Sequence, residues 1–384
     1  MKILIAPDKF KGSLSAGDVA ENIALGLRGV LRNTEMAIVP MADGGEGTAE
    51  VVCNALGGSW VKCKAHDPFG REIDARYAWI ANRKLAVMEM SEAAGMRQLS
   101  ESERNPVRAT TFGVGEMILD AARGGANEII IGLGGSATND GGFGMARSLG
   151  FRFFSCIGLG TYLLGRLRGE RLGPPELMES VVELRMLETI KKPKNVSLPR
   201  IIAAVDVRNP LNGNNGATRV FGPQKGATPD QIQQLELALV RLADVVEQEF
   251  GFDYRDEPGA GAAGGLGFGL MSFCGAKIRP GFEVVAEAAD FESKMKNADV
   301  VITGEGSLDR QTLEGKTAAG IAGLARKLGK PVFAIAGRTD GNRQVRELFD
   351  GVYVLGQPGM SENEKMKRSA ELLREGAQEL AKSL

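Results

Sequence analysis

The sequence predicts an α/β protein with more than one domain. Short apolar runs with β propensity repeatedly precede glycine-rich loops and helical stripes, and this alternation favours parallel sheets flanked by helices. The chain has 384 residues, which is long for a single core because one domain holds roughly 150 residues. Two strands with no helix between them in the first third of the chain indicate that part of the structure is a mixed sheet.

Two strand–helix units are expected at the N-terminus. KILIAP (2–7) predicts a strand, and Ser15 with Asp18 resembles a capping box at the start of a helix. The apolar stripe of that helix comprises Val19, Ile23, Leu27 and Leu31. A second strand is expected at 36–39 and a second helix at 48–56, joined by the loop MADGGEG.

The alternation of strands and helices stops after the turn DPFG (67–70). REIDARYAWI and KLAVMEM follow as two strands without a helix, so we expect antiparallel or mixed pairing there. A second domain is therefore expected to begin near residue 65. Residues 161–197 are charged and lack a clear period, which predicts surface helix and loop.

The strand–helix alternation returns further along the chain. NEIIIGLGGSATNDGGFGMARSLG and NADVVITGEGSLDRQTLEGKTAAGIAGLARKLG repeat it, KPVFAIAGRTDG and GVYVLG add strands, and Ser361 with Glu364 opens a terminal helix. Residues 258–276 carry no charge over nearly the length of a membrane-spanning helix. Their seven glycines favour a buried loop and helix instead.

Composition excludes several classes of protein. The formal net charge is -1 and lysine and arginine are spread along the chain, so no nucleic-acid partner is expected. The four cysteines form no CxxC pair, which fits a reducing compartment. The N-terminus becomes charged too soon for a signal peptide. These features predict a cytoplasmic protein with no membrane partner.

Three glycine-rich loops carry the candidate chemistry. GLGGSATNDGG, MADGGEG and ITGEGSLDRQT each follow an apolar strand and each contains a carboxylate. Backbone amides at such junctions bind phosphate, and added carboxylates suggest phosphate together with Mg²⁺. Phosphoryl transfer is the leading reaction class. The alternative is structural, because Ser136, Thr138, Asp140 and Thr48 are also typical helix caps.

Longer motifs then identify a family. MKILIAPDKFKGSLSA, MADGGEGT, DPFGR, IGLGGSATNDGG, DVRNPLNGNNGA, VFGPQKGAT, GAGAAGGLG and VITGEGSLDRQTLEGKT occur in order along nearly the whole chain. In this the sequence resembles the bacterial glycerate kinase family, the type acting in glucarate, galactarate and glyoxylate metabolism. The resemblance implies ATP-dependent phosphorylation of D-glycerate to 2-phosphoglycerate with Mg²⁺.

The resemblance also implies a domain arrangement. A Rossmann-like parallel-sheet domain would comprise residues 1–65 and 285–384, and an inserted α/β domain with a mixed sheet would comprise 66–284. The active site is expected in the cleft between them. D-Glycerate and ATP are the expected partners, and a homo-oligomer is compatible with the sequence.

The strand-end loops supply the candidate site residues. The catalytic candidates are Asp206, Asp43, Asp140 and Lys9, and Asp206 and Asp43 are also the candidate Mg²⁺ ligands. Candidates for binding phosphate or nucleotide are Gly134, Gly135, Ser136, Thr138, Gly304, Gly306, Ser307 and Lys316. Candidates for binding the substrate are Ser13, Glu46, Asn139 and Arg310.

Some alternatives stay open. Arg208 and Asn212 stand where the family pattern has an acid and a cysteine. The loss of the acid at Arg208 favours one rival, a non-catalytic sugar-acid or nucleotide sensor. A nicotinamide-dependent hydroxy-acid oxidoreductase is a second rival, although no GxGxxG follows the first strand. Within the kinase class, the 3-hydroxyl or a related small hydroxy acid is the alternative acceptor.

Overall fold

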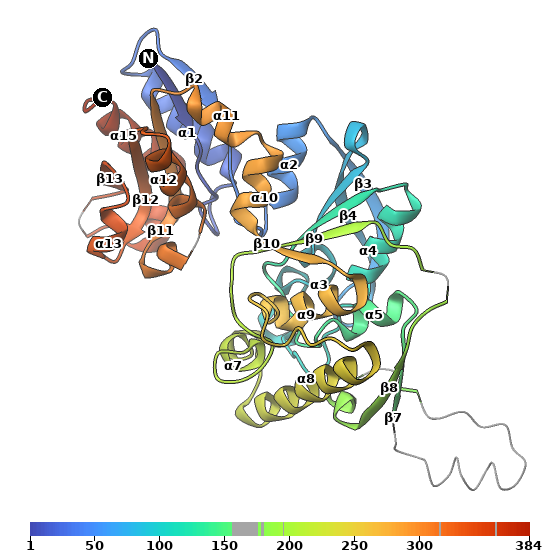
Figure 1. The fold of residues 1–384 in the computed structure, drawn as a ribbon. Coiled ribbons are helices and arrows are strands. Elements are labelled where there is room, and N and C mark those ends of the chain that lie inside the picture. Colours follow the sequence, from blue (N-terminus) through green and yellow to red (C-terminus); the bar gives the residue numbers. More distant parts are fainter. Residues whose placement is uncertain (156–175, 178–179, 195, 315, 358) are drawn as a thin grey trace, which may run out of the picture. The chain divides into compact units, whose positions relative to one another are not determined.

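The chain folds into two compact units, each with its own sheet (Figure 1). The computed structural model describes residues 1–155, 176–177, 180–194, 196–314, 316–357 and 359–384. Unit 1 comprises Met1–Gly58 and Pro280–Leu384, and unit 2 comprises Ser59–Arg279. The predicted fold class is confirmed, because the sheet of unit 1 is parallel and that of unit 2 is mixed. Among the described helices, none is both long and apolar enough to cross a membrane.

Five parallel strands form the sheet of unit 1. Their order is β13 (Gly351–Val354), β12 (Val332–Thr339), β11 (Val300–Leu308), β1 (Lys2–Ile5) and β2 (Glu35–Ile38). The chain moves outward from β1 to β2 and later returns to β11 on the other side of β1. This reversal makes the boundary between β1 and β11 a topological switch point, where doubly wound sheets bind their ligands.

Helices pack on both faces of this sheet. On one face α1 (Ala16–Arg28) packs against α15 (Ser369–Ala381), so closely that a Cβ on Gly26 would lie 2.4 Å from the Arg374 carbonyl oxygen. The predicted capping box of Ser15 and Asp18 opens α1. The other helices of the unit are α2 (Thr48–Leu56), α10 (Gly281–Ala288), α11 (Phe291–Lys296), α12 (Thr317–Lys327), α13 (Arg343–Arg346) and α14 (Glu362–Lys367).

The sheet of unit 2 is mixed. Its order is β10 (Lys277–Pro280), β9 (Arg200–Val205), β6 (Glu128–Gly132), β5 (Leu85–Glu89), β4 (Glu72–Ile80) and β3 (Ser59–His66). β3, β4 and β5 pair antiparallel, and β5, β6 and β9 pair parallel. β4 and β5 follow from the sequence pattern, but β3 does not, because the buried residues of β3 are the small Cys63 and Ala65.

Six helices complete the described part of unit 2. They are α3 (Ser91–Ala94), α4 (Phe112–Arg123), α5 (Phe143–Ser148), α7 (Ala217–Phe221), α8 (Pro229–Phe250) and α9 (Ala262–Cys274). α9 lies within the uncharged segment, and nearly all of its residues are buried, as predicted. It contains a kink, since Ala263, Gly264 and Gly265 have positive φ angles.

Two sequence expectations need correction. Part of the segment expected as surface helix and loop is a strand, β8 (Leu187–Lys191), which pairs with β7 (Arg152–Ser155). Leu187 and Ile190 are buried there beside Phe153. Pairing with β7 therefore makes this segment a strand, although its sequence has no clear apolar period. Residues 161–175, 178–179 and 195 lie outside the described residues. The terminal segment forms two helices, α14 and α15, rather than one.

Candidate active site

Three carboxylates meet at the switch point of unit 1. Ile5 of β1 is in register with Ile302 of β11 and with Ile38 of β2, so the residues that follow these positions lie at one edge of the sheet. Asp8 follows β1, Asp43 follows β2, and Glu305 lies near the end of β11. The charge of Asp43 raises the pKa of both Asp8 and Glu305, which indicates that the three side chains are close together.

Asp8 is a buried carboxylate held from two sides. It is 6% exposed, and it accepts hydrogen bonds of 2.6 Å from both the Thr317 hydroxyl and the Lys9 amide. Burial and the nearby charge of Asp43 raise the pKa of Asp8 to about 7, although the hydrogen bonds oppose this shift. Asp8 is therefore only partly ionised at neutral pH in the absence of a cation.

Glu305 is the second perturbed carboxylate. Its Oε1 lies 3.5 Å from Lys316 Nζ. Its Oε2 is buried and has no hydrogen-bond partner among the described residues. Burial, together with the charges of Asp8 and Asp43, raises the pKa of Glu305 to about 8. An unpartnered carboxylate oxygen among other acids fits a position that a cation would occupy.

Backbone contacts fix the third loop of this cluster. Asp43 Oδ1 accepts a hydrogen bond from the Gly45 amide at 3.1 Å. Lys9 Nζ donates to the carbonyl oxygen of Glu46. A Cβ on Gly281 would lie 1.7 Å from the Asp43 carbonyl oxygen, so the first turn of α10 rests directly on this loop. Only glycine permits that approach.

The cluster has the composition of a site for a metal that arrives with phosphate. In the part of the chain that the structure describes, no group of three or more His, Cys, Asp or Glu residues could hold a metal ion by itself. Mg²⁺ usually binds through one or two carboxylates and completes its shell with phosphate oxygens and water. Asp8, Asp43 and Glu305 provide carboxylates of that kind, with Lys9 and Lys316 beside them.

The expectation of a glycine loop at 304–307 is wrong. β11 continues through these residues to Leu308, and Gly304, Glu305, Ser307 and Leu308 pair in register with β12. The backbone of Gly304, Gly306 and Ser307 is therefore part of a strand, and their role as phosphate-binding amides stays a prediction. Ser307 Oγ donates to Asp309 at 2.8 Å.

Two further predicted residues of unit 1 have local contacts. The Arg310 amide donates to Asp340 at 3.2 Å, and the Arg310 side chain is exposed. Ser13 Oγ donates to the Phe10 carbonyl oxygen at 3.1 Å. Their predicted roles in binding substrate stay predictions.

In unit 2, Asp140 has the contacts of a helix cap. It is 1% exposed, and its carboxylate accepts hydrogen bonds from the amides of Thr111, Gly142 and Gly144 and from the Thr111 hydroxyl. Burial raises the pKa of Asp140, while these hydrogen bonds oppose the shift. Every contact joins the loop to α4 or α5, which is the capping alternative that the sequence left open.

Two neighbours of Asp140 line a buried polar cluster. Asn139 donates to the Thr218 hydroxyl at 2.9 Å, and Lys225 Nζ donates to the Thr138 carbonyl oxygen at 2.7 Å. Burial lowers the pKa of Lys225 to about 7, although Asp140 opposes this. Asn139 Oδ1 and Thr138 Oγ1 have no hydrogen-bond partner among the described residues.

Glycines of α9 permit close packing against this loop. A Cβ on Gly264 of α9 would lie 2.0 Å from the Thr138 carbonyl oxygen, and one on Gly269 would lie 2.6 Å from that of Gly141. Gly141 donates its amide to the Gly264 carbonyl oxygen at 3.0 Å. The close approach of the loop backbone to the α9 backbone therefore depends on glycine in these segments.

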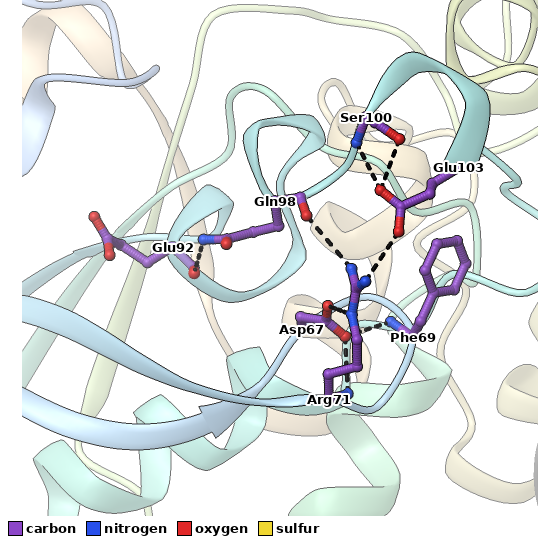
Figure 2. Close-up of polar contacts among 7 residues, drawn as sticks. All are labelled: Asp67, Phe69, Arg71, Glu92, Gln98, Ser100 and Glu103. Carbon is purple, nitrogen blue, oxygen red and sulfur yellow. Dashed lines mark hydrogen bonds and ion pairs between the residues drawn. The ribbon is translucent and has the colours of Figure 1, made fainter.

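A polar network joins the turn that contains Asp67 and Arg71 to the segment 98–103 (Figure 2). Asp67 accepts from the Arg71 side chain and from the amides of Phe69 and Arg71, and Arg71 Nη1 donates to Glu103 at 2.9 Å. Glu103 also accepts hydrogen bonds from Ser100, which with Arg71 lower the pKa of Glu103 to about 2. The network holds segment 98–103, which follows Met96 in the chain.

The residues just before that segment bond the glycine loop. The Met96 amide donates to the Gly135 carbonyl oxygen at 2.8 Å, and Gly95 forms a bridge with Ser136. Gly135 has φ +69, which disfavours any other residue. Gly134 and Asp206 lie at a common edge, because Gly132 of β6 is in register with Ala204 of β9. Asp206 thus neighbours the start of the loop.

Sequence reasoning missed three residues of these sites. Asp8 lies in the quoted motif APDKFKGS, but a single acid after a strand gave no sign that it would be buried. Thr317 ends the motif VITGEGSLDRQTLEGKT, and no local signal indicates that its hydroxyl bonds Asp8. Lys225 lies in VFGPQKGAT and was not singled out, because lysine in a loop is normally solvated.

The structure defines an α/β protein with a cluster of acidic residues at the switch point of its parallel sheet. Comparisons with known proteins then give the family. The family model described as the glycerate kinase family matches residues 3–384. The chain belongs to this family, and it is accordingly a member of a family of kinases.

Individual relatives agree with this assignment. The chain is 41% identical to the glycerate kinase of Halalkalibacterium halodurans, over 99% of this chain and 97% of the relative. It is 39% identical to the glycerate 2-kinase of Escherichia coli, over 94% and 89% of the two chains. A crystal structure assigned as glycerate kinase 2 from Salmonella typhimurium LT2 is 38% identical and superposes with a TM-score of 0.83, covering 100% of this chain and 98% of that one.

Proposed function

We propose that this protein transfers the terminal phosphoryl group of ATP to the 2-hydroxyl of D-glycerate, giving 2-phosphoglycerate and ADP. The observation that carries the proposal is the cluster of Asp8, Asp43 and Glu305 at the switch point, with Lys9 and Lys316 beside it. Phosphoryl transfer requires charge neutralisation and positioning more than covalent help from the protein. The choice of the 2-hydroxyl rests on the similarity to the E. coli glycerate 2-kinase.

Mg²⁺ belongs to the same proposal. One or two carboxylates of the cluster of Asp8, Asp43 and Glu305 would hold it together with phosphate oxygens and water, and the unpartnered Glu305 Oε2 is the observation that fits a cation. When bound, Mg²⁺ would neutralise charge on the phosphate oxygens. Lys9 and Lys316 would add positive charge near the same oxygens.

The residues of the chain then have to orient the acceptor and remove its proton. The 2-hydroxyl oxygen bonds to the terminal phosphorus as the bond from that phosphorus to the bridging oxygen of ADP breaks. The hydroxyl proton passes to a carboxylate. Asp206 is our candidate for this base, so Asp206→Asn should lower kcat by orders of magnitude and leave the fold intact.

One assay separates this proposal from its rivals. ATP, Mg²⁺ and D-glycerate should give ADP at a steady rate, and ³¹P NMR of the product should show a 2-phosphate ester. A 3-phosphate ester would transfer the proposal to the other hydroxyl. Reduction of a nicotinamide without ADP would indicate an oxidoreductase, and stabilisation by ligand without turnover would indicate a sensor.

A cytoplasmic location is part of the proposal. ATP is a cytoplasmic phosphoryl donor, and Cys53, Cys63 and Cys274 are free thiols, as expected in a reducing compartment.

A further inference from the structure

Unit 1 contains a cavity beside the carboxylate cluster. Its volume is about 410 Å³, and its walls come from residues 8–17, from residues 38–42, from the start and outer face of α2, and from Lys294 of α11. Asp8 and Lys9 belong both to this cavity and to the cluster. Whatever fills the cavity therefore lies next to the proposed phosphate site.

The wall of the cavity is largely apolar. Phe10, Leu14, Ile38, Met41, Val51 and Ala55 contribute to it. Small-molecule sites typically combine such a lining with a few polar groups, in volumes of roughly 300–1,000 Å³. Here Ser13 and Asn54 supply hydroxyl and amide groups. The occupant should have a broad apolar surface and an edge that forms hydrogen bonds.

We infer that this cavity binds the nucleoside of the phosphoryl donor, with the base against the apolar wall and the phosphates directed to Asp8. This inference rests on the proposed function and names the donor subsite within it. Glycerate does not match the lining, because each of its carbon atoms carries oxygen and leaves no apolar face to bury. A purine has two apolar faces and a polar edge, which an amide such as that of Asn54 can bond.

A tryptophan placed in the cavity gives a direct test. Ala55 is exposed and lines the cavity, so Ala55→Trp fills space without disturbing the core. We expect the KM for ATP to rise about tenfold or more, equivalent to roughly 1.4 kcal/mol of lost binding, while the KM for D-glycerate changes less than about twofold. Leu25→Trp is the matched control, since Leu25 is 50% exposed on α1 and does not line the cavity.

Kinetics alone would separate the two substrates. If Ala55→Trp raises the KM for glycerate and leaves that for ATP unchanged, the cavity belongs to the acceptor and the inference is wrong, although the proposed function stands. If both KM values stay at the wild-type level, the cavity binds neither substrate and the inference is again wrong.

A second experiment uses the unaltered protein and needs no turnover. An azido-ATP photoprobe with Mg²⁺ should label peptides from residues 9–17 or 38–55, and excess ADP should suppress the labelling. Labelling confined to unit 2 would overturn the inference. If wild-type protein forms no phosphoglycerate but is labelled in these peptides, the nucleoside subsite stands and the proposed function fails.

Discussion

The acidic cluster of unit 1 and the glycine loop of unit 2 arise from the same sequence pattern but differ in how their carboxylates are satisfied. Asp140 accepts hydrogen bonds from three backbone amides and a hydroxyl. Glu305 has an oxygen with no hydrogen-bond partner among the described residues. Burial raises the pKa of Asp140 as well as those of Asp8 and Glu305, but only in the last two does the charge of a neighbouring carboxylate, Asp43, add to the shift. Hydrogen bonds from the protein satisfy Asp140, whereas crowded carboxylates with an unpartnered oxygen indicate a candidate ligand site.

The largest expected effect comes from removing the charge of Asp8. Asp8→Asn should lower kcat/KM by about 10³-fold, close to 4 kcal/mol of transition-state stabilisation, because a carboxylate next to the transferred phosphate is lost. Steady-state ADP release checks this. Asp140→Asn should instead lower the free energy of unfolding and leave the kcat of the folded fraction within a few-fold of wild type. Equal losses of kcat in two equally folded variants would show that Asp140 is catalytic, as first predicted.

Packing of the glycine loop should give the next largest effect. Gly264→Ala should reduce the free energy of unfolding by about 3 kcal/mol or more, since the new Cβ meets the Thr138 carbonyl oxygen at 2.0 Å and φ is +69. Urea denaturation measures the change. Gly323→Ala is the control, because its Cβ meets nothing within 4 Å on an exposed face of α12, and it should stabilise by up to about 1 kcal/mol.

The pH dependence of stability should reveal the raised pKa of Glu305. Its folded-state pKa of about 8 exceeds the ordinary value of 4.5, so the folded state keeps a proton that the unfolded state releases. Metal-free wild type should therefore lose about 3 kcal/mol of stability relative to Glu305→Gln as the pH rises from about 5 to 7.5. Urea denaturation of both proteins at pH 5 and at pH 7.5 measures this change. An equal difference in the free energy of unfolding at the two pH values would refute the raised pKa of Glu305.

Lys225 should give a slope of the opposite sign. Its folded-state pKa of about 7 is below the ordinary value of 10.5, so the unfolded state holds the extra proton in this interval. Wild type should gain about 2 kcal/mol relative to Lys225→Met between pH 7 and pH 9. Lys225→Met also loses the hydrogen bond to the Thr138 carbonyl oxygen, which changes its free energy of unfolding by the same amount at every pH. The slope of the stability difference against pH is independent of that constant amount. A flat difference between pH 7 and pH 9 would mean that the buried ammonium titrates normally.

The sequence predicted the alternating elements well, because periodicity and caps are local signals. The start of α1 at the Ser15 cap and the extent of α2 followed directly. β3 and β8 were missed, since their pairing depends on partners distant in sequence and on few buried apolar residues. The end of β11 was misjudged because its glycines resemble a loop, while the register with β12 keeps them in the sheet.

The candidate site was predictable only in part. Asp43, Lys9 and Lys316 were chosen from strand-end motifs, and in the structure they lie around Asp8 and Glu305. The burial of Asp8 and of Lys225 could not be read from the chain, because burial of a charged group depends on several elements packing over it. Whether Asp140 binds a ligand or caps a helix likewise depended on where the amides of Thr111 and Gly144 point.

Proton release on binding of Mg²⁺ and ADP tests the central claim most directly. Calorimetry at pH 7 in two buffers of different ionisation enthalpy counts the protons, because a metal that binds carboxylates with raised pKa values displaces their protons. We predict release of roughly one proton from wild type, clearly less from Glu305→Gln, and an unchanged value from Asp140→Asn. Undiminished release from Glu305→Gln, or its loss only in Asp140→Asn, would contradict a metal–phosphate site at the switch point of unit 1.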